Sequence, residues 1–258
     1  MIELDRIYNE DCMDGMRRIP DASMNCILCD PPYGTTACRW DVTLPLDALW
    51  QQYTRIIRPD GVIVLFCCQP FTSTLVLSNP GWFRFMLYWR KSRPAGYVNA
   101  RHMPLRDIEE IAVFSPASTA NGAAVNIKYR PQGLVEVNRP WHRPVIHDRK
   151  SAVSYSRAGH AVQRTIRYTG YPRQVLDFSN TNRGLVHPTQ KPVALIEYLV
   201  RTFSDEGDTV LDNCMGSGTT AIACIRSGRH FVGFETDPVF HRAAMDRIRA
   251  ERGADGQE

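Results

Sequence analysis

An acidic residue followed by two prolines and a tyrosine is the clearest segment whose side chains could do chemistry. Asp30-Pro31-Pro32-Tyr33 comes directly after the apolar run 24–29, which is typical of a buried strand that stops at the prolines. A carboxylate at the end of a sheet strand faces the ligand crevice and can accept a hydrogen bond from an amine. The prolines leave carbonyl acceptors free, and a tyrosine ring can stack on a planar base. The plainer alternative is a proline-stopped strand with a surface tyrosine.

A glycine-rich segment near the C-terminus has the residues of a cofactor-binding turn. It runs from Asp212 to Ala221 and fits the pattern G-x-G-x-x-A. Glycines let the backbone turn tightly and approach a ligand, and the N-terminus of a following helix offers free N–H groups to an anion. Glu235 ends the next predicted strand, where an acid can accept both hydroxyls of a ribose. Together these features predict a nucleoside-bearing cofactor, whereas glycines alone indicate only a tight turn.

The length of chain after this turn limits the kind of nucleoside. Only 40 of the 258 residues follow Gly218, which is too few for the second mononucleotide-binding half that a dinucleotide requires. A nicotinamide oxidoreductase is therefore disfavoured, and a smaller nucleoside ligand is expected.

The elements that must position these residues alternate between strands and helices. Hydrophobic patterning predicts strands at 24–29, 62–66, 83–89, 108–114, 208–212 and 230–235, and helices at 46–57, 193–203, 219–226 and 238–252. A turn is expected at 58–61. Such alternation predicts an α/β fold with a parallel sheet and right-handed crossovers.

The chain divides into three blocks of different character. Residues 1–115 and 185–258 are regular and form the two halves of one domain, whereas 116–184 is rich in Arg, Pro, Asn, Ser and Tyr and predicts loops mounted on it. The net charge is +4, yet seventeen Lys and Arg against six Asp and Glu between residues 84 and 183 give +11 there and leave −7 elsewhere. A basic middle in an acidic protein indicates a polyanion such as nucleic acid.

Composition and cysteine placement exclude several other classes of protein. No apolar run reaches membrane-spanning length, and acids stand at the N-terminus where a signal peptide has bases, so a cytoplasmic protein is expected. Cys26 and Cys29 have C-x-x-C spacing, but on a strand they point to opposite faces and cannot share a metal. They are interpreted as small apolar core residues.

Three motifs in their order along the chain resemble one family. Asp30 to Tyr33 resembles the DPPY catalytic motif of DNA amino-methyltransferases, Asp212 to Thr220 their S-adenosylmethionine loop, and residues 187–192 their HPTQKP segment. The catalytic motif precedes the cofactor loop, with a variable region between them, which is the permuted order called the β class. The resemblance implies the Rossmann-like α/β fold of S-adenosylmethionine-dependent methyltransferases, a mostly parallel twisted sheet with helices on both faces. It also implies that residues 116–184 are the target-recognition region.

The resemblance assigns the catalytic role to Asp30, Pro31, Pro32 and Tyr33. The target base would swing out of the duplex and stack on Tyr33. The Asp30 carboxylate and the Pro31 carbonyl would accept hydrogen bonds from its amine, whose lone pair is otherwise delocalised into the ring. The transfer would be direct and in line, without a metal or a covalent cysteine step.

The resemblance also implies where S-adenosylmethionine would bind. Glu235 would bind its ribose hydroxyls and Asp11 its adenine amine. Asp212 would lie near its ammonium group and Lys191 would pair with its carboxylate. The implied cofactor residues are Asp11, Asp30, Lys191, Asp212, Cys214, Gly216, Ser217, Gly218, Thr219, Thr220 and Glu235. The loop departs from the family pattern Asp-Pro-Phe, because Cys214 stands where an aromatic ring usually lies against the cofactor.

The prediction of the target base depends on one residue of the motif, Asp30. Family members that act on cytosine N4 mostly carry Ser where this chain has Asp30, so adenine N6 in double-stranded DNA is expected. Alternatives are an N4-cytosine methyltransferase, an adenine methyltransferase acting on RNA, and a DNA-binding relative without catalysis. A restriction-modification setting and a solitary or phage-borne enzyme are both left open, and so is a homodimer.

Basic residues of the variable block are the candidates for DNA contact. They could bind phosphates and guanine edges. They are Arg130, Arg139, Arg143, Arg149, Lys150, Arg157, Arg164, Arg167 and Arg173. Residues 89–92 with Gly96 and Tyr97 resemble a family loop near the flipped base.

Overall fold

The computed structural model describes residues 2–34, 43–142, 163–180 and 190–255. Two compact units can be distinguished, one made of residues 1–130 and 174–258 and the other of residues 131–173. The first unit contains β1 (Arg6–Tyr8), α1 (Cys12–Met16), β2 (Met24–Cys29), α2 (Leu46–Ile56), β3 (Ile57–Cys67), α3 (Phe71–Ser78), β4 (Phe83–Ala95), η1 (Tyr97–Asn99), β5 (Arg106–Phe114), β8 (Val175–Phe178), α4 (Val193–Phe203), β9 (Thr209–Asp212), α5 (Thr219–Ser227), β10 (His230–Phe234) and α6 (Pro238–Asp255).

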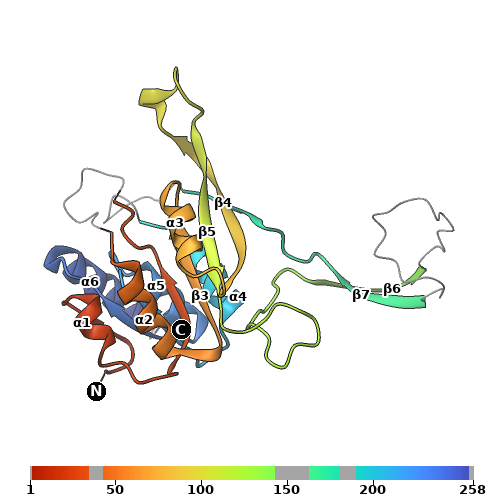
Figure 1. The fold of residues 1–258 in the computed structure, drawn as a ribbon, viewed down its shortest axis with the longest axis horizontal. Helices are drawn as coiled ribbons and strands as arrows, with labels where there is room; N and C mark the ends of the chain where they lie inside the picture. Colours follow the sequence, from red (N-terminus) through yellow and green to blue (C-terminus); the bar gives the residue numbers. More distant parts are fainter. Residues whose placement is uncertain (1, 35–42, 143–162, 181–189, 256–258) are drawn as a thin grey trace. The chain divides into compact units, whose positions relative to one another are not determined.

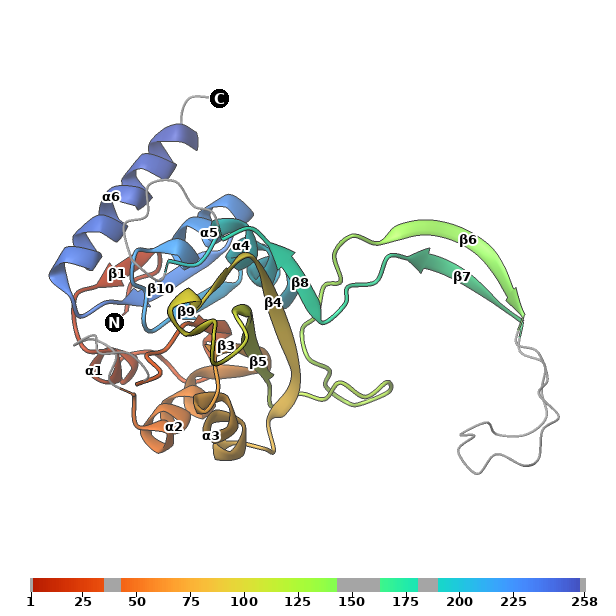
Figure 2. The same cartoon turned by 90° about the horizontal axis from the view of Figure 1, so that it is seen from above.

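The first unit is built on an eight-stranded sheet in the order β1-β10-β9-β2-β3-β5-β4-β8 (Figures 1 and 2). Only β5 runs antiparallel to its neighbours β3 and β4; the other pairs are parallel. The predicted α/β sheet of mostly parallel strands is therefore confirmed. β2, β9 and β10 end side by side, which is where ligands bind in such sheets.

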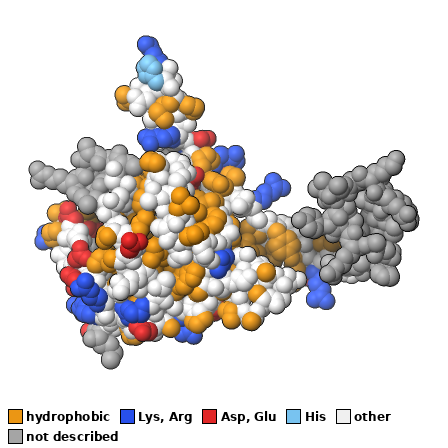
Figure 3. Space-filling model, in the orientation of Figure 1, with side chains coloured by type: hydrophobic (Ala, Val, Ile, Leu, Met, Phe, Trp, Pro, Cys, Tyr) orange, Lys and Arg blue, Asp and Glu red, His pale blue; other side chains and the backbone are white. Residues whose placement is uncertain are grey.

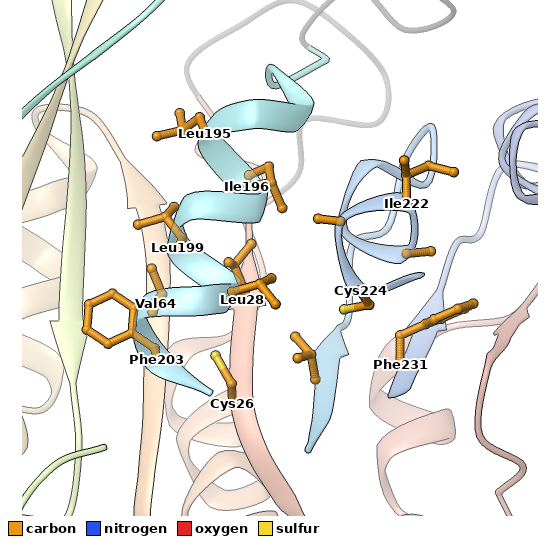
Figure 4. Close-up of a cluster of buried hydrophobic side chains, with 14 of the residues drawn as sticks. Cys26, Leu28, Val64, Leu195, Ile196, Leu199, Phe203, Ile222, Cys224 and Phe231 are labelled. Atoms are coloured by element: carbon orange, nitrogen blue, oxygen red, sulfur yellow. The ribbon is translucent and has the colours of Figure 1, made fainter. Parts of the chain in front are cut away.

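Helices cover both faces of this sheet, each over its own apolar core. Helices α4, α5 and α6 pack on one face with residues such as Leu28, Leu199 and Phe231 (Figure 4). Helices α1, α2 and α3 pack on the other with Ile27 and Tyr53. Alternate residues of β2 enter different cores, so Cys26 belongs to the first core and Cys29 to the second. The prediction that these two cysteines point to opposite faces is confirmed.

Most predicted elements match the observed ones within a few residues. One difference is the expected turn at 58–61, which lies inside β3. The register shows why: Ile57 pairs with Met24 and Val62 pairs with Cys26, so four residues of β3 stand opposite one of β2. The chain bulges there instead of leaving the sheet. The short elements β1, α1 and α3 were not predicted, because three to eight residues carry too little periodicity.

Strands β4 and β5 form a hairpin that extends beyond the sheet, with η1 at its tip (Figure 1). Val98 and Tyr97 are exposed at 97% and 66%. Arg93, Arg101 and Arg106 are also exposed, and no acid lies between residues 92 and 106. Basic and histidine side chains gather at this tip (Figure 3). The hairpin therefore presents a basic surface with apolar side chains among the charges.

The second unit contains a two-stranded antiparallel ladder of β6 (Val135–His142) and β7 (Gln163–Thr169). The expectation of irregular structure was wrong for these strands. Val135, Val137, Trp141 and Tyr168 stay substantially exposed. The alternation of apolar and polar residues covers only the start of β6, and the rest of the two strands is mostly polar, so the periodic signal is weak. In the part of the chain that is described, no helix combines the length and hydropathy needed to cross a bilayer.

Candidate active site

A cavity of about 790 Å³ opens at the carboxyl ends of β2, β9 and β10. It brings together residues that are more than two hundred positions apart in the sequence, such as Asp11 and Glu235. The predicted site residues that line it are Asp11, Asp30, Pro31, Pro32, Tyr33, Lys191, Asp212, Cys214, Gly216, Ser217, Thr219, Thr220 and Glu235. Of the described segment 190–192, Gln190 also lines the cavity, whereas residues 187–189 lie outside the described residues.

Gly218 is the predicted site residue that does not line the cavity. Its φ of +79° favours glycine, and a Cβ there would lie 2.9 Å from the Cβ of Ala244 on α6. It therefore allows α5 to start close against α6. Gly216 also has a positive φ, +52°, but a Cβ at this position would meet no neighbouring atom within 4 Å. Gly216 thus leaves open space along the loop at the cavity.

Both oxygens of the Asp30 carboxylate are engaged by the chain itself. Lys191 Nζ donates to Oδ2 at 2.6 Å, and the Tyr33 hydroxyl donates to Oδ1. Burial, followed by the nearby carboxylates of Asp30 and Glu109, raises the pKa of Tyr33 well above its ordinary value, so the phenol keeps its proton and remains a donor. The Tyr33 ring packs against Phe71 with centroids 5.5 Å apart.

Lys191 bridges two carboxylates. Besides Asp30, its Nζ lies 2.7 Å from Oε1 of Glu109 on β5. The other oxygen of Glu109, Oε2, lies 2.6 Å from Nζ of Lys91 on β4. Burial alone would lower the pKa of Lys191, but Asp30 and Glu109 raise it above its ordinary value, so it stays an ammonium group. Glu109 lines the cavity but was not predicted from the sequence, whereas Lys91, which also lines it, belongs to the segment 89–92 that resembles a family loop near the flipped base. The predicted contact of Lys191 with a cofactor carboxylate stays a prediction.

Asp212 ends β9 as a buried carboxyl group. Thr220 Oγ1 donates to its Oδ2 at 2.6 Å, and the Cys214 amide donates to its Oδ1 at 3.1 Å. Burial raises the pKa of Asp212 to about 7, although both hydrogen bonds oppose this. A carboxyl group with a pKa near 7 is partly protonated at neutral pH, and a cation that binds beside it would favour its ionised form.

Glu235 follows β10 and is fixed by two backbone amides. Gly216 N donates to Oε2 and Asp237 N donates to Oε1, each at 2.8 Å. Each carboxylate oxygen keeps a second lone pair that can accept from a ligand hydroxyl. The hydrogen bond from Gly216 also ties the acid to the glycine-rich loop.

Asp11 caps the N-terminus of α1. One carboxylate oxygen, Oδ1, accepts from Met13 N at 2.7 Å, which satisfies one of the free amides of that helix. Asp11 lines the cavity beside Glu10 and Cys12. A capping role and a ligand-binding role are compatible, because the second oxygen is not needed for this hydrogen bond.

Cys214 lies in a cluster of polar and thiol groups where α1, β2 and the loop after β9 meet. Asn213 Nδ2 lies 3.6 Å from Cys214 Sγ and 3.7 Å from Cys12 Sγ. The buried hydroxyl of Tyr53 donates to Asn213 Oδ1 at 2.5 Å. Burial raises the pKa of the neighbouring Cys29 to about 11, so this thiol stays neutral. The cluster anchors the loop from beneath, with Cys214 facing the cavity.

Within the described ranges, no group of three or more His, Cys, Asp and Glu side chains could hold a metal ion. The carboxyl, ammonium and hydroxyl groups that line the cavity support hydrogen bonding and charge stabilisation. Its acids suit an amine, a ribose and an ammonium group, and its aromatic ring suits a planar base.

Solved structures with this fold define the class of the protein. The chain is similar to the M1.HpyAVI–SAM complex, at 22% identity with a TM-score of 0.61, covering 94% of this chain and 98% of that one. It is also similar to the cytosine-N4-specific PvuII DNA methyltransferase, at 16% identity with a TM-score of 0.64, covering 98% and 93%. The protein therefore has the Rossmann-like fold of S-adenosylmethionine-dependent methyltransferases.

The family follows from the sequence comparison. The family model of the N6/N4 methyltransferases, described as DNA methylase, matches residues 24–246, and the chain belongs to this family. Among its relatives is the type II methyltransferase M1.MboII of Moraxella bovis, which is 25% identical over 246 residues, covering 90% of this chain and 92% of the relative.

Proposed function

We propose that the protein transfers a methyl group from S-adenosylmethionine to the N6 amine of adenine in double-stranded DNA. The observation that carries this proposal is that one cavity is lined both by Asp30, Pro31 and Tyr33 and by the acids Asp212 and Glu235. The first group offers acceptors for an amine and a ring for a base. The second group offers partners for a nucleoside that bears an amino acid.

The residues present fit S-adenosylmethionine. Glu235 would accept from the ribose hydroxyls and Asp11 from the adenine amine. Asp212 would lie at the ammonium group, and the open backbone at Gly216 would admit the methionine portion. When bound, this cofactor supplies a methyl group activated by a positively charged sulfur.

Asp30 would act on the target amine. Its carboxylate and the Pro31 carbonyl accept the two N–H groups, which favours a pyramidal nitrogen whose lone pair points at the methyl carbon. The N–C bond forms as the S–C bond breaks, and the electron pair of the broken bond remains on sulfur. The nitrogen then loses one proton, which Asp30 can accept. Tyr33 would leave its hydrogen bond to Asp30 and stack on the base.

Binding of the cofactor should depend on pH through Asp212. Its pKa of about 7 means that it is largely protonated below that pH, whereas the ammonium group of the cofactor favours the ionised form. Binding below pH 7 must therefore release a proton, and affinity should fall by up to about tenfold per pH unit as the pH drops from 7 to 5.5. Calorimetry in buffers of different ionisation enthalpy would measure both the number of protons released and the affinity for the cofactor. An Asp212→Asn variant should lack the proton release; an affinity independent of pH in the unmodified protein would contradict this role.

Adenine is favoured over cytosine because the motif begins with Asp30. The likeness to a cytosine-N4-specific enzyme at 16% identity concerns the fold and does not extend to the base. The motif order along the chain supports the permuted β class. The type II relative supports a restriction-modification setting.

Two surfaces would contact the DNA. One is the tip of the β4–β5 hairpin, whose base contributes Trp89, Lys91 and Glu109 to the cavity. The other is the unit of residues 131–173, which exposes Arg139, Arg167 and Arg173. Arg130, another predicted candidate, is paired with Asp205 at 2.8 and 3.0 Å. The candidates Arg143, Arg149, Lys150 and Arg157 lie outside the described residues.

Removing one charge at the hairpin tip tests the DNA surface. Arg101→Ala should weaken DNA binding and lower the slope of log affinity against log salt by about 0.9, because one phosphate contact is lost. Fluorescence anisotropy at several salt concentrations would measure this. Arg249→Ala on α6, also an exposed arginine, is the matched control and should leave the slope unchanged. An unaltered slope for Arg101→Ala would remove the tip from the DNA surface.

The proposed function is tested by identifying the product. Purified protein, unmethylated DNA and labelled S-adenosylmethionine would be incubated, and the DNA digested to nucleosides. Label in N6-methyldeoxyadenosine is expected. Label in N4-methyldeoxycytidine would keep the enzyme class but overturn the base, and no label with intact DNA binding would favour a non-catalytic binder or an RNA substrate.

A further inference from the structure

Glu109 is a buried acid between two lysines, at the base of the β4–β5 hairpin. Its side chain is 10% exposed, and it lies 2.7 Å from Lys191 and 2.6 Å from Lys91. Burial alone would raise its pKa, but the two lysines lower it, so it remains a carboxylate. Among the described residues none donates a well-directed hydrogen bond to its Oε1, so the charge of Lys191 is the main compensation for that oxygen.

We propose that Glu109 is a positioning residue for methyl transfer, which acts by holding Lys191 against the Asp30 carboxylate. The proposal rests on the proposed function, in which Asp30 accepts the target amine. Lys191 lies between the two acids and touches Oδ2 of Asp30. The ammonium group therefore fixes the plane of the Asp30 carboxylate and leaves Oδ1, which the Tyr33 hydroxyl occupies here, as the oxygen that a base can reach.

The balance of charge explains why both lysines and both acids are needed. Asp30, Glu109, Lys91 and Lys191 together are neutral in a site that is largely shielded from water. Without the charge of Glu109, Lys91 would lose its carboxylate partner, and Lys191 would keep Asp30 alone and would no longer be held at a fixed point between two acids. Its contact with Asp30 would loosen, and misplacement by about 1 Å can cost on the order of a hundredfold in rate.

The register of the hairpin places Glu109 on the cavity side and offers a matched control. Glu109 pairs with Trp89, which also lines the cavity. The next residue, Glu110, points to the opposite face, where it accepts a hydrogen bond from Thr72 at 2.5 Å. A change of Glu to Gln at either position alters the same chemical group in the same strand, but only one of the two groups contacts Lys191.

Steady-state kinetics of Glu109→Gln would test the proposal. The expected result is a fall in kcat of roughly 10- to 100-fold, with the Kd for S-adenosylmethionine and the KM for DNA within about threefold of the unmodified protein. Glu110→Gln should retain kcat. Glu109→Asp keeps the charge but shortens its reach, so it should fold and still lose kcat; wild-type kcat in this variant would overturn the proposal even if Glu109→Gln failed to fold.

A double-mutant cycle separates action through Lys191 from a general structural effect. If Glu109 acts through Lys191, adding Glu109→Gln to Lys191→Met should lower kcat little further, whereas independent effects would multiply. Multiplying losses, or an unchanged kcat in Glu109→Gln, would overturn the proposal while leaving the methyltransferase function intact. Failure of the unmodified protein to label DNA would instead overturn the proposed function itself.

Discussion

The Asp30→Ala protein is expected to bind S-adenosylmethionine but to transfer no measurable methyl group to DNA. The amine of the target base is a poor nucleophile, and the carboxylate that would polarise it is removed. Loss of one preorganised group that stabilises charge in a transition state typically costs on the order of 10²–10³ in kcat, and loss of the acceptor for the released proton adds to this. Calorimetry with the cofactor and a labelled-methyl assay would measure the two properties separately.

Controls for this variant follow from the contacts of Asp30. Alanine leaves Lys191 without one of its two carboxylate partners, so a thermal unfolding curve must accompany the assay. Asp30→Asn keeps the shape and one acceptor oxygen and should also be inactive, because the amide lacks the charge. Asp246→Asn, on the exposed side of α6, should behave as the unmodified protein. Loss of cofactor binding in a folded Asp30→Asn protein would show that Asp30 serves the cofactor instead.

The sheet and its ligand-binding edge could be predicted because long apolar runs and glycine-rich turns have strong local signatures. β2, α4 and β9 were expected within a residue of their observed bounds. The prolines after Asp30 and the acid at Glu235 mark strand ends, and strand ends of a parallel sheet meet at one edge. The meeting of the two motifs in one cavity could therefore be predicted from the sequence.

The charge network around Lys191 could not be predicted in the same way. Glu109 and Glu110 are adjacent acids in one strand, and the choice of which faces the cavity depends on the register of β5 against β4. Lys91 was placed near the flipped base by resemblance, but its ion pair with Glu109 depends on β4, which extends six residues beyond the predicted strand. The pairing of β4 with β5 decides which acid faces the cavity and how far β4 extends, and neither feature has a signature in the local sequence.

The departure at Asn213 and Cys214 has a structural explanation that only the fold reveals. Tyr53 lies buried on α2, but nothing in the sequence links its hydroxyl to an amide 160 residues later. This hydrogen bond compensates the burial of Asn213, which is 2% exposed. The loop is thus fixed by polar contacts from below, and the smaller Cys214 leaves the cavity wider than an aromatic ring would.

Replacing Glu235 by glutamine is expected to weaken the binding of S-adenosylmethionine about a hundredfold while DNA binding is retained. The acid sits where it can accept two ribose hydroxyls, and hydrogen bonds to a charged group contribute about 1.5–3 kcal/mol each, so losing much of this interaction corresponds to roughly two orders of magnitude in Kd. Equilibrium dialysis with labelled cofactor would measure the change, with Glu206→Gln, an exposed acid, as the control.

A loss of affinity in this variant could also arise from a displaced loop, because Glu235 accepts backbone hydrogen bonds from Gly216 and Asp237. Glutamine keeps one acceptor oxygen for these amides but offers a donor in place of the other. S-adenosylhomocysteine carries the same ribose, so the substitution should lower its affinity by the same factor. Analogues with a 2′-deoxy or 3′-deoxy ribose lack one of the hydroxyls, so their affinity should fall less than that of the parent compound. Equal losses for all of these ligands would mean that Glu235 only holds the loop, and the ribose contact would have to be assigned to another residue.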